Sequence, residues 1–125
     1  MREKKDLGDL GEKIAEDFLK NKGYRILDKN LRYSNFGELD IIAKRGNDIV
    51  FFEVKTRKKT GPSEFLPEDN ITRDKQRKLI KLAEIYLSKN NLEGVSWQID
   101  ILAIETYLNG SFDIRHMENA VGDMW

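Results

Sequence analysis

The chain has 125 residues, 39% of them hydrophobic and 35% charged, and its 22 basic and 22 acidic residues give a formal net charge of zero. This length and composition predict a single globular domain spanning residues 1–125, because no room remains for a second domain of ordinary size. No apolar run approaches the roughly 20 residues of a membrane span, and the charged start lacks the apolar core of a signal peptide. We therefore expect a cytoplasmic protein with no membrane partner.

Residue types restrict the metal chemistry open to this chain. Cysteine is absent, and histidine occurs once, at His116. Disulfides and thiolate metal sites are therefore excluded, and any metal ion would be held mainly by oxygen. Hard divalent cations, Mg²⁺ or Mn²⁺, suit such ligands best.

The first third of the chain predicts one helix followed by strands. Apolar residues recur at helical spacing through residues 6–22, and the segment Asn21-Lys22-Gly23 is a helix stop signal. Residues 24–31 indicate a first strand, residues 33–37 a turn, and residues 38–56 a hairpin. Three consecutive strands in a meander are therefore expected.

The remainder predicts a loop, a second helix and two more strands. Residues 58–70 contain Gly61, Pro62 and Pro67, which is typical of a loop. Thr72 can cap a helix that runs to about Lys89. Residues 96–107 favour a strand, and Asn109-Gly110 is a type I′ turn signal leading into a short strand over residues 111–116. The inward residues expected on the second helix are Leu79, Leu82, Ala83, Tyr86 and Leu87. The order α-β-β-β-α-β, with a final short strand, predicts an α/β fold with a mixed central sheet flanked by helices.

The hairpin carries charged residues on two otherwise apolar strands. A two-residue turn at Gly46-Asn47, with a positive φ at glycine, would define the strand register. The pairs that follow are Arg45 with Asp48, Ile42 with Phe51, Asp40 with Glu53, and Glu38 with Lys55. Opposed carboxylates destabilise a hairpin unless a positive charge sits between them. A divalent cation is the expected partner.

The other face of the same hairpin is apolar. It places Leu39, Ile41 and Ala43 opposite Val54, Phe52 and Val50. We expect this face to pack on a helix.

The charged face could hydrolyse a phosphodiester. A bound divalent ion can help to form the nucleophile, stabilise the phosphoryl oxygens and assist the leaving oxygen. Asp40 and Glu53 supply hard anionic ligands, and Lys55 could orient or deprotonate the attacking water or stabilise negative charge. The competing interpretation is that Glu38 and Lys55 form an ordinary cross-strand ion pair on a solvated face.

Basic residues cluster directly after these acids. Residues 55–81 contain nine Lys or Arg and four acids, a local charge of +5 that the rest of the chain balances. This distribution is compatible with a solvated surface or with a phosphate-binding stripe. The residues of this basic stripe that are expected to contact nucleic acid are Arg57, Lys58, Lys59, Lys75, Arg77 and Lys78.

The combined pattern resembles a known group of nucleases. Its signature parts are Gly37-Glu38-Leu39-Asp40 and Phe52-Glu53-Val54-Lys55-Thr56-Arg57. The further matches are Gly11-Glu12, Ala15, Gly23, Ile42-Ala43, Gly61, Lys75-Gln76, Ala83, Tyr86-Leu87 and Asp100-Ile101. These residues resemble the small bacterial YraN-like family of predicted endonucleases, within the PD-(D/E)XK, or restriction-endonuclease-like, superfamily.

The resemblance implies a restriction-endonuclease-like αβββαβ core with an extra C-terminal strand. It implies that Asp40 and Glu53 are ligands of Mg²⁺ or Mn²⁺, that Lys55 is the catalytic lysine, and that Glu12 and the Val54 carbonyl complete the metal shell. Glu38 is expected as an accessory acid. The implied activity is metal-dependent hydrolysis of DNA, including branched or single-stranded forms.

Two other functions fit the same residues. A non-catalytic nucleic-acid-binding module would keep the fold and the basic stripe without using a metal. An assembly protein could place its acidic C-terminal part, residues 93–125, against the basic stripe of another copy, so a homodimer is compatible with the sequence.

Overall fold

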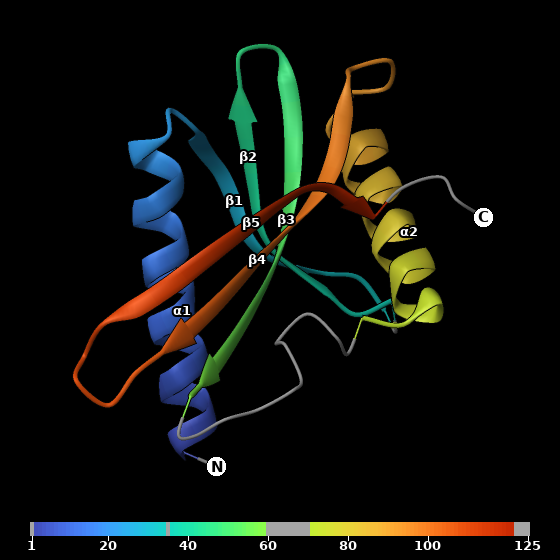
Figure 1. The fold of residues 1–125 in the computed structure, drawn as a ribbon. Helices are drawn as coiled ribbons and strands as arrows, with labels where there is room; N and C mark the ends of the chain where they lie inside the picture. Colours follow the sequence, from blue (N-terminus) through green and yellow to red (C-terminus); the bar gives the residue numbers. More distant parts are fainter. Residues whose placement is uncertain (1, 35, 60–70, 122–125) are drawn as a thin grey trace.

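The computed structural model describes residues 2–34, 36–59 and 71–121. Within these ranges two helices and five strands follow one another along the chain (Figure 1). They are α1 (Arg2–Asn21), β1 (Arg25–Arg32), β2 (Glu38–Arg45), β3 (Asp48–Lys58), α2 (Arg73–Lys89), β4 (Trp97–Thr106) and β5 (Phe112–Val121). The predicted αβββαβ order with an added C-terminal strand is confirmed. Most of the expected loop over residues 58–70 lies outside the described residues, and β3 extends to Lys58.

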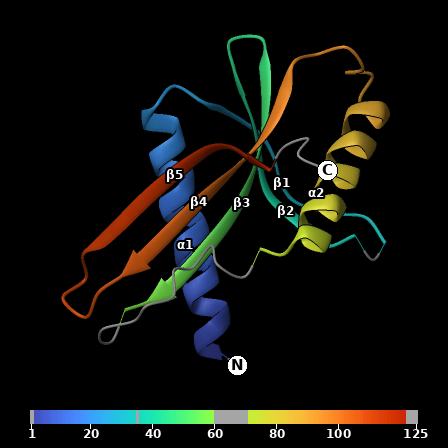
Figure 2. The same ribbon diagram turned by 45° about the vertical axis from the view of Figure 1, so that its right-hand side comes forward.

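The strands form one mixed sheet in the order β1-β2-β3-β4-β5. Neighbouring strands are antiparallel except β3 and β4, which are parallel. A parallel pair needs a crossover connection, and α2 lies in the segment between these two strands. Figures 1 and 2 show α1 and α2 on opposite faces of the sheet.

Each helix covers an apolar face because side chains alternate along the strands. The face under α1 contains Val50 and Phe52, and the face under α2 contains Phe51. All five inward residues predicted for α2 are buried. That helix begins as predicted, because the Thr72 hydroxyl accepts a hydrogen bond from Lys75 N–H at 3.2 Å.

The predicted hairpin register holds near the turn and fails farther out. Gly46 has a φ of +63°, and the pairing runs from Arg45–Asp48 to Ile41–Phe52. The predicted pairs Asp40–Glu53 and Glu38–Lys55 are not formed, because β2 leaves β3 beyond Ile41. Glu38 instead pairs with Arg32 of β1.

Where β2 separates from β3, one residue lies on the opposite face of the sheet from the predicted one. Leu39 was expected on the same face as Ile41 and Ala43, but those two residues lie under α1, whereas Leu39 is buried among the residues that pack on α2. The alternation of side chains breaks between Leu39 and Ile41, where the hairpin ladder ends. The apolar face under α1 is therefore shorter than predicted.

The last hairpin differs from the predicted one in turn type and length. Gly110 has a positive φ of 87°, whereas Asn109 does not, so a type I′ turn is excluded. The Asn109 side chain accepts from Ser111 N–H at 3.0 Å, a local bond that favours the alternative turn. Strand β5 continues to Val121, five residues beyond the predicted end at His116, and stays paired with β4 across an irregularity between Ile99 and Ile101.

No helix in the described ranges combines the length and the apolar character needed to cross a membrane.

Candidate active site

The predicted site lies where β2 separates from β3. Beyond the Ile41–Phe52 pair, the Asp40 carboxylate takes the place of a strand neighbour and accepts a hydrogen bond from Val54 N–H at 2.7 Å. This bond satisfies a main-chain donor that would otherwise lose its ladder partner. Asp40 is thus held in the space between the two diverging strands.

Three carboxylates from two elements meet at this point. Glu12 of α1, and Glu38 and Asp40 of β2, place carboxylate oxygens within 4.8 Å of one another. We call these residues the carboxylate cluster. With its amide nitrogen facing the cluster, Asn30 donates to Glu12 Oε1 at 2.6 Å and to Glu38 Oε1 at 3.0 Å. Arg32 adds an ion pair with Glu38.

The acids of this region oppose one another's ionisation. Burial, followed by the charge of Glu53, raises the pKa of Asp40 to about 8, although the Val54 hydrogen bond acts against the shift. Burial and then the neighbouring Glu38 charge raise the pKa of Glu12. A cation placed among these groups would favour their ionised forms.

Glu53 and Lys55 form an ion pair beside the cluster. The Lys55 Nζ to Glu53 Oε1 distance is 3.2 Å, and their side chains are only 26% and 14% exposed. Burial raises the pKa of Glu53, whereas Lys55 acts in the opposite direction. Glu53 lies outside the carboxylate cluster, so the predicted pair of directly opposed acids is replaced by a wider group.

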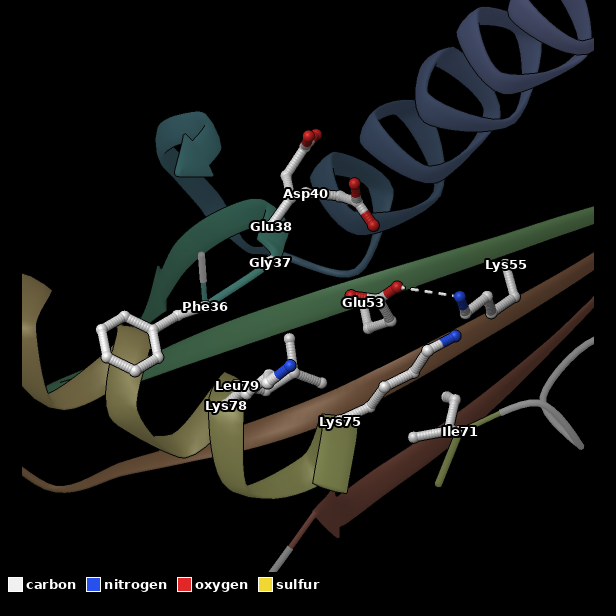
Figure 3. A pocket seen from close by; sticks show the side chains of 10 residues that line it. All are labelled: Phe36, Gly37, Glu38, Asp40, Glu53, Lys55, Ile71, Lys75, Lys78 and Leu79. Carbon is white, nitrogen blue, oxygen red and sulfur yellow. Dashed lines mark ion pairs between the residues drawn. The ribbon is translucent and has the colours of Figure 1, made fainter. Parts of the chain in front are cut away.

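Two cavities reach this region from opposite faces of the sheet. The α2-side cavity, of about 360 Å³, is lined by Phe36, Gly37, Glu38, Asp40, Glu53, Lys55, Ile71, Lys75, Lys78 and Leu79 (Figure 3). The α1-side cavity, of about 460 Å³, is lined by Leu7, Gly8, Glu12, Asp40, Val54, Lys55, Thr56, Arg57 and Lys58. Asp40 and Lys55 line both cavities, so they can be reached from either face.

The structure divides the predicted basic stripe between these cavities. Lys75 and Lys78 line the α2-side cavity, whereas Arg57 and Lys58 line the α1-side cavity. Lys59 and Arg77 line neither of the two. The basic residues therefore approach the acids from two directions.

Two of these basic residues already have acidic partners. Arg57 Nη2 is 2.7 Å from Glu105 Oε2, and this hydrogen bond holds the pKa of Glu105 below its usual range. Lys78 pairs with Asp74 at 3.3 Å on the surface of α2.

A close contact between α1 and β3 positions Glu12. Gly11 is buried, and a Cβ atom at this position would lie 1.9 Å from Thr56 Oγ1 and 2.9 Å from Thr56 Cβ. Only glycine allows this approach, which brings the next residue, Glu12, to Asp40. Gly11 is one of two glycines within the helix, so the sequence alone did not identify the one that makes this contact.

A second polar cluster lies under α1 and was not predicted. Asp100 is fully buried, and its carboxylate accepts hydrogen bonds from His116 Nε2 at 2.7 Å, Gln98 Nε2 at 2.7 Å and Asn119 N–H at 2.8 Å. Glu118 lies close enough to form a possible three-ligand metal group with Asp100 and His116. However, Lys22 Nζ is 3.3 Å from His116 Nδ1. Nδ1 can accept a hydrogen bond from Lys22 when the ring proton is on Nε2, and Nε2 then donates that proton to Asp100. Hydrogen bonding, not metal binding, therefore fits this cluster.

Replacing the fully buried Asp100 by alanine should destabilise the fold by about 3 kcal/mol, because donors on Gln98, His116 and Asn119 would lose their shared acceptor. Urea unfolding measures this loss. Asp17→Ala is the matched control, because Asp17 is 56% exposed and its ion pair with Lys13 should contribute well under 1 kcal/mol. Equal losses in the two variants would contradict the structural role of Asp100.

Comparison with known proteins assigns the chain to a family. The model of the Uncharacterised protein family UPF0102 matches residues 11–104. The chain belongs to this family. The match includes Glu12, the whole β2–β3 hairpin and α2, and therefore every residue of the predicted site.

Relatives from several bacteria match over nearly their whole length. A UPF0102 protein of Caldanaerobacter subterraneus is 44% identical over 106 residues, covering 85% of this chain and 83% of the relative. Those of Caldicellulosiruptor saccharolyticus and Persephonella marina are each 42% identical, covering 94% and 90% of this chain and 98% and 90% of the relatives. These names state family membership and no reaction, so function has to be argued from the site.

Proposed function

We propose that this protein is a metal-dependent nuclease that hydrolyses phosphodiester bonds of DNA in the cytoplasm. The observation that carries the proposal is the meeting of the carboxylate cluster with the Glu53–Lys55 ion pair, between two cavities that also contain basic residues. Acids, a half-buried lysine and phosphate-binding groups are the parts that metal-assisted phosphodiester hydrolysis requires.

The donor set fits Mg²⁺ or Mn²⁺. Asp40, Glu12 and Glu38 offer hard oxygen ligands within one small volume, and Glu53 and the Val54 carbonyl would complete the shell. The raised pKa values of Asp40 and Glu12 support a cation site, because a nearby positive charge would offset the burial and the neighbouring negative charges that disfavour their ionised forms. A bound ion would supply Lewis acidity toward a phosphoryl oxygen and lower the pKa of a bound water.

Lys55 is the residue best placed to act on the reacting phosphate. Its ammonium group lies beside Glu53 and borders both cavities, where it can donate a hydrogen bond to a phosphoryl oxygen or hold a water in position. Its ion pair with Glu53 restricts the side chain before substrate binds, which reduces the entropy lost on binding.

The basic stripe would bind the DNA backbone on either side of the reacting phosphate. Lys75 and Lys78 would neutralise phosphates in the α2-side cavity. Arg57 and Lys58 would do so in the α1-side cavity, where the bond to Glu105 holds Arg57 in a fixed position. Such contacts position a strand without reading its sequence.

A cleavage assay tests the proposal. Single-stranded, duplex and branched DNA are incubated with the protein and Mg²⁺ or Mn²⁺. We expect cleavage of at least one substrate, no cleavage in EDTA, and a loss of at least about 100-fold in Glu53→Gln. Glu84→Gln, an exposed acid on α2 that lines neither cavity, should cleave like the wild type.

Two results would contradict the proposal. One is an absence of cleavage with every substrate and metal. The other is cleavage that persists unchanged in EDTA or in Glu53→Gln. Salt-sensitive DNA binding without cleavage would instead favour the non-catalytic binding module.

A further inference from the structure

The α2-side cavity has two chemically different ends. Its charged end contains Asp40, Glu53 and Lys55, and Figure 3 shows the amino groups of Lys55 and Lys75 near Glu53. Figure 3 shows Phe36 and Leu79 on the side of Glu53 away from Lys55, whereas Ile71 lies near Lys75. A site that bound only a metal ion and phosphate would gain nothing from this apolar end.

Phe36 is half-buried and packs against the core under α2, so the apolar end has a supported wall. Leu79 closes it from α2 and is 5% exposed. The volume of about 360 Å³ lies within the range of roughly 300–1,000 Å³ that is usual for small-ligand pockets. Apolar walls beside charged groups suit a ligand with one flat apolar part and one anionic part.

We propose that the apolar end binds one unpaired nucleobase, stacked on Phe36, while the phosphate attached to that nucleotide lies at Lys75 and Lys55. This inference rests on the proposed function and assigns its substrate class: nucleic acid that presents an unpaired nucleotide at the site. A base in an intact duplex is stacked on its neighbours and has no free face for Phe36. Single strands, and branched DNA with unpaired positions, can present one.

The neighbouring aromatic residue provides a matched control. Tyr33 belongs to the same turn and is 43% exposed, but it does not line the cavity, and Lys89 Nζ lies 4.4 Å from its ring centre. Its greater exposure would make it the first choice for a stacking residue on accessibility alone. Phe36, and not Tyr33, lines the cavity, so Phe36 is the proposed stacking residue.

The test separates base binding from cleavage. Fluorescence anisotropy compares a labelled oligomer of twelve thymidine nucleotides with an equally long oligomer of abasic tetrahydrofuran nucleotides, which keeps the phosphates and lacks the bases. Binding is measured in Ca²⁺, and a gel verifies that both oligomers stay intact. The wild type should bind the thymidine oligomer about tenfold more tightly than the abasic one.

Phe36→Leu should reduce that ratio to less than about twofold, because leucine fills the wall but offers no aromatic face. Tyr33→Ala should keep the wild-type ratio. The ratio is measured within each variant, so a partly unfolded sample lowers both affinities without imitating the effect, and circular dichroism monitors folding. A ratio near one in the wild type, an unchanged ratio in Phe36→Leu, or an equal loss in Tyr33→Ala would overturn the proposal.

Different experimental results would refute the base-pocket proposal and the nuclease proposal. Base-dependent binding that requires Phe36, without metal-dependent cleavage, supports the pocket and refutes the nuclease. Metal-dependent cleavage without base-dependent binding supports the nuclease and refutes the pocket.

Discussion

Asp40→Asn should abolish DNA cleavage and at the same time stabilise the fold at neutral pH. The asparagine side-chain oxygen can still accept the hydrogen bond from Val54 N–H, so the local structure should persist. Cleavage should fall by at least about 100-fold, because the proposed metal would lose an anionic ligand. The stability should rise because asparagine is neutral in the folded and unfolded states, so folding no longer requires a carboxyl group either to take up a proton or to stay ionised near Glu53, Glu38 and Glu12.

The gain in stability should depend on pH. The pKa of Asp40 is about 8 in the folded chain, above its ordinary value of 3.8. Between these values the folded state binds more protons than the unfolded state, so folding stability falls as pH rises through this window. Below the ordinary value Asp40 is protonated in both states, so folding requires no proton uptake and this cost disappears.

Urea unfolding of wild type and Asp40→Asn at pH 4 and pH 7.5 measures this difference. Each unit of pKa shift corresponds to about 1.4 kcal/mol, and after structural relaxation we expect a gain of roughly 2 kcal/mol at pH 7.5 and little at pH 4. Mg²⁺ should stabilise the wild type and reduce the gap. A destabilised variant at pH 7.5, or a gap that does not change with pH, would contradict the electrostatic explanation.

Gly11→Ala should destabilise the protein, even though alanine is the better helix former. The added Cβ atom would lie 1.9 Å from Thr56 Oγ1, and Thr56 is branched at the Cβ atom that lies 2.9 Å away. Helix α1 must then move away from β3, at a cost of about 2–3 kcal/mol. The same movement withdraws Glu12 from the carboxylate cluster, so cleavage should fall as well.

Gly8→Ala is the control within the same helix. No atom lies within 4 Å of a Cβ atom at Gly8, and alanine there should stabilise the helix by about 0.5–1 kcal/mol. Thermal unfolding of both variants measures the contrast. In Gly11→Ala, the further change Thr56→Ala removes two of the three clashing atoms and should restore part of the stability. Equal effects of the two glycine substitutions on thermal stability would contradict the prediction that the close α1–β3 contact excludes a Cβ atom at position 11.

Local patterns predicted most of the fold. The capping residue Thr72 and the helical spacing that ends at Leu87 located α2, and the continuous apolar run of residues 49–52 located β3. The glycine at position 46 gave the correct register next to the turn. These features depend on bonds and contacts within a few residues, so short stretches of sequence contain the necessary information.

The arrangement of the predicted site was only partly predictable. Counting outward from a turn assumes that a ladder continues, and it therefore placed Asp40 opposite Glu53. The strands separate one pair earlier, and Glu38 pairs with Arg32 of β1 instead of Lys55. Glu12 was suggested by resemblance alone, because its approach depends on how α1 packs on Thr56.

The sequence by itself determined the order of the elements, the apolar faces of the sheet near the turn and the identity of the charged residues at the end of the hairpin. Only the tertiary structure decided which acids meet, that Asp40 and Lys55 border two cavities, and that Phe36 lines one of them while Tyr33 does not. The physical reason is that these juxtapositions join α1, β1, β2, β3 and α2. They follow from strand divergence and helix packing, which no spacing along one segment encodes.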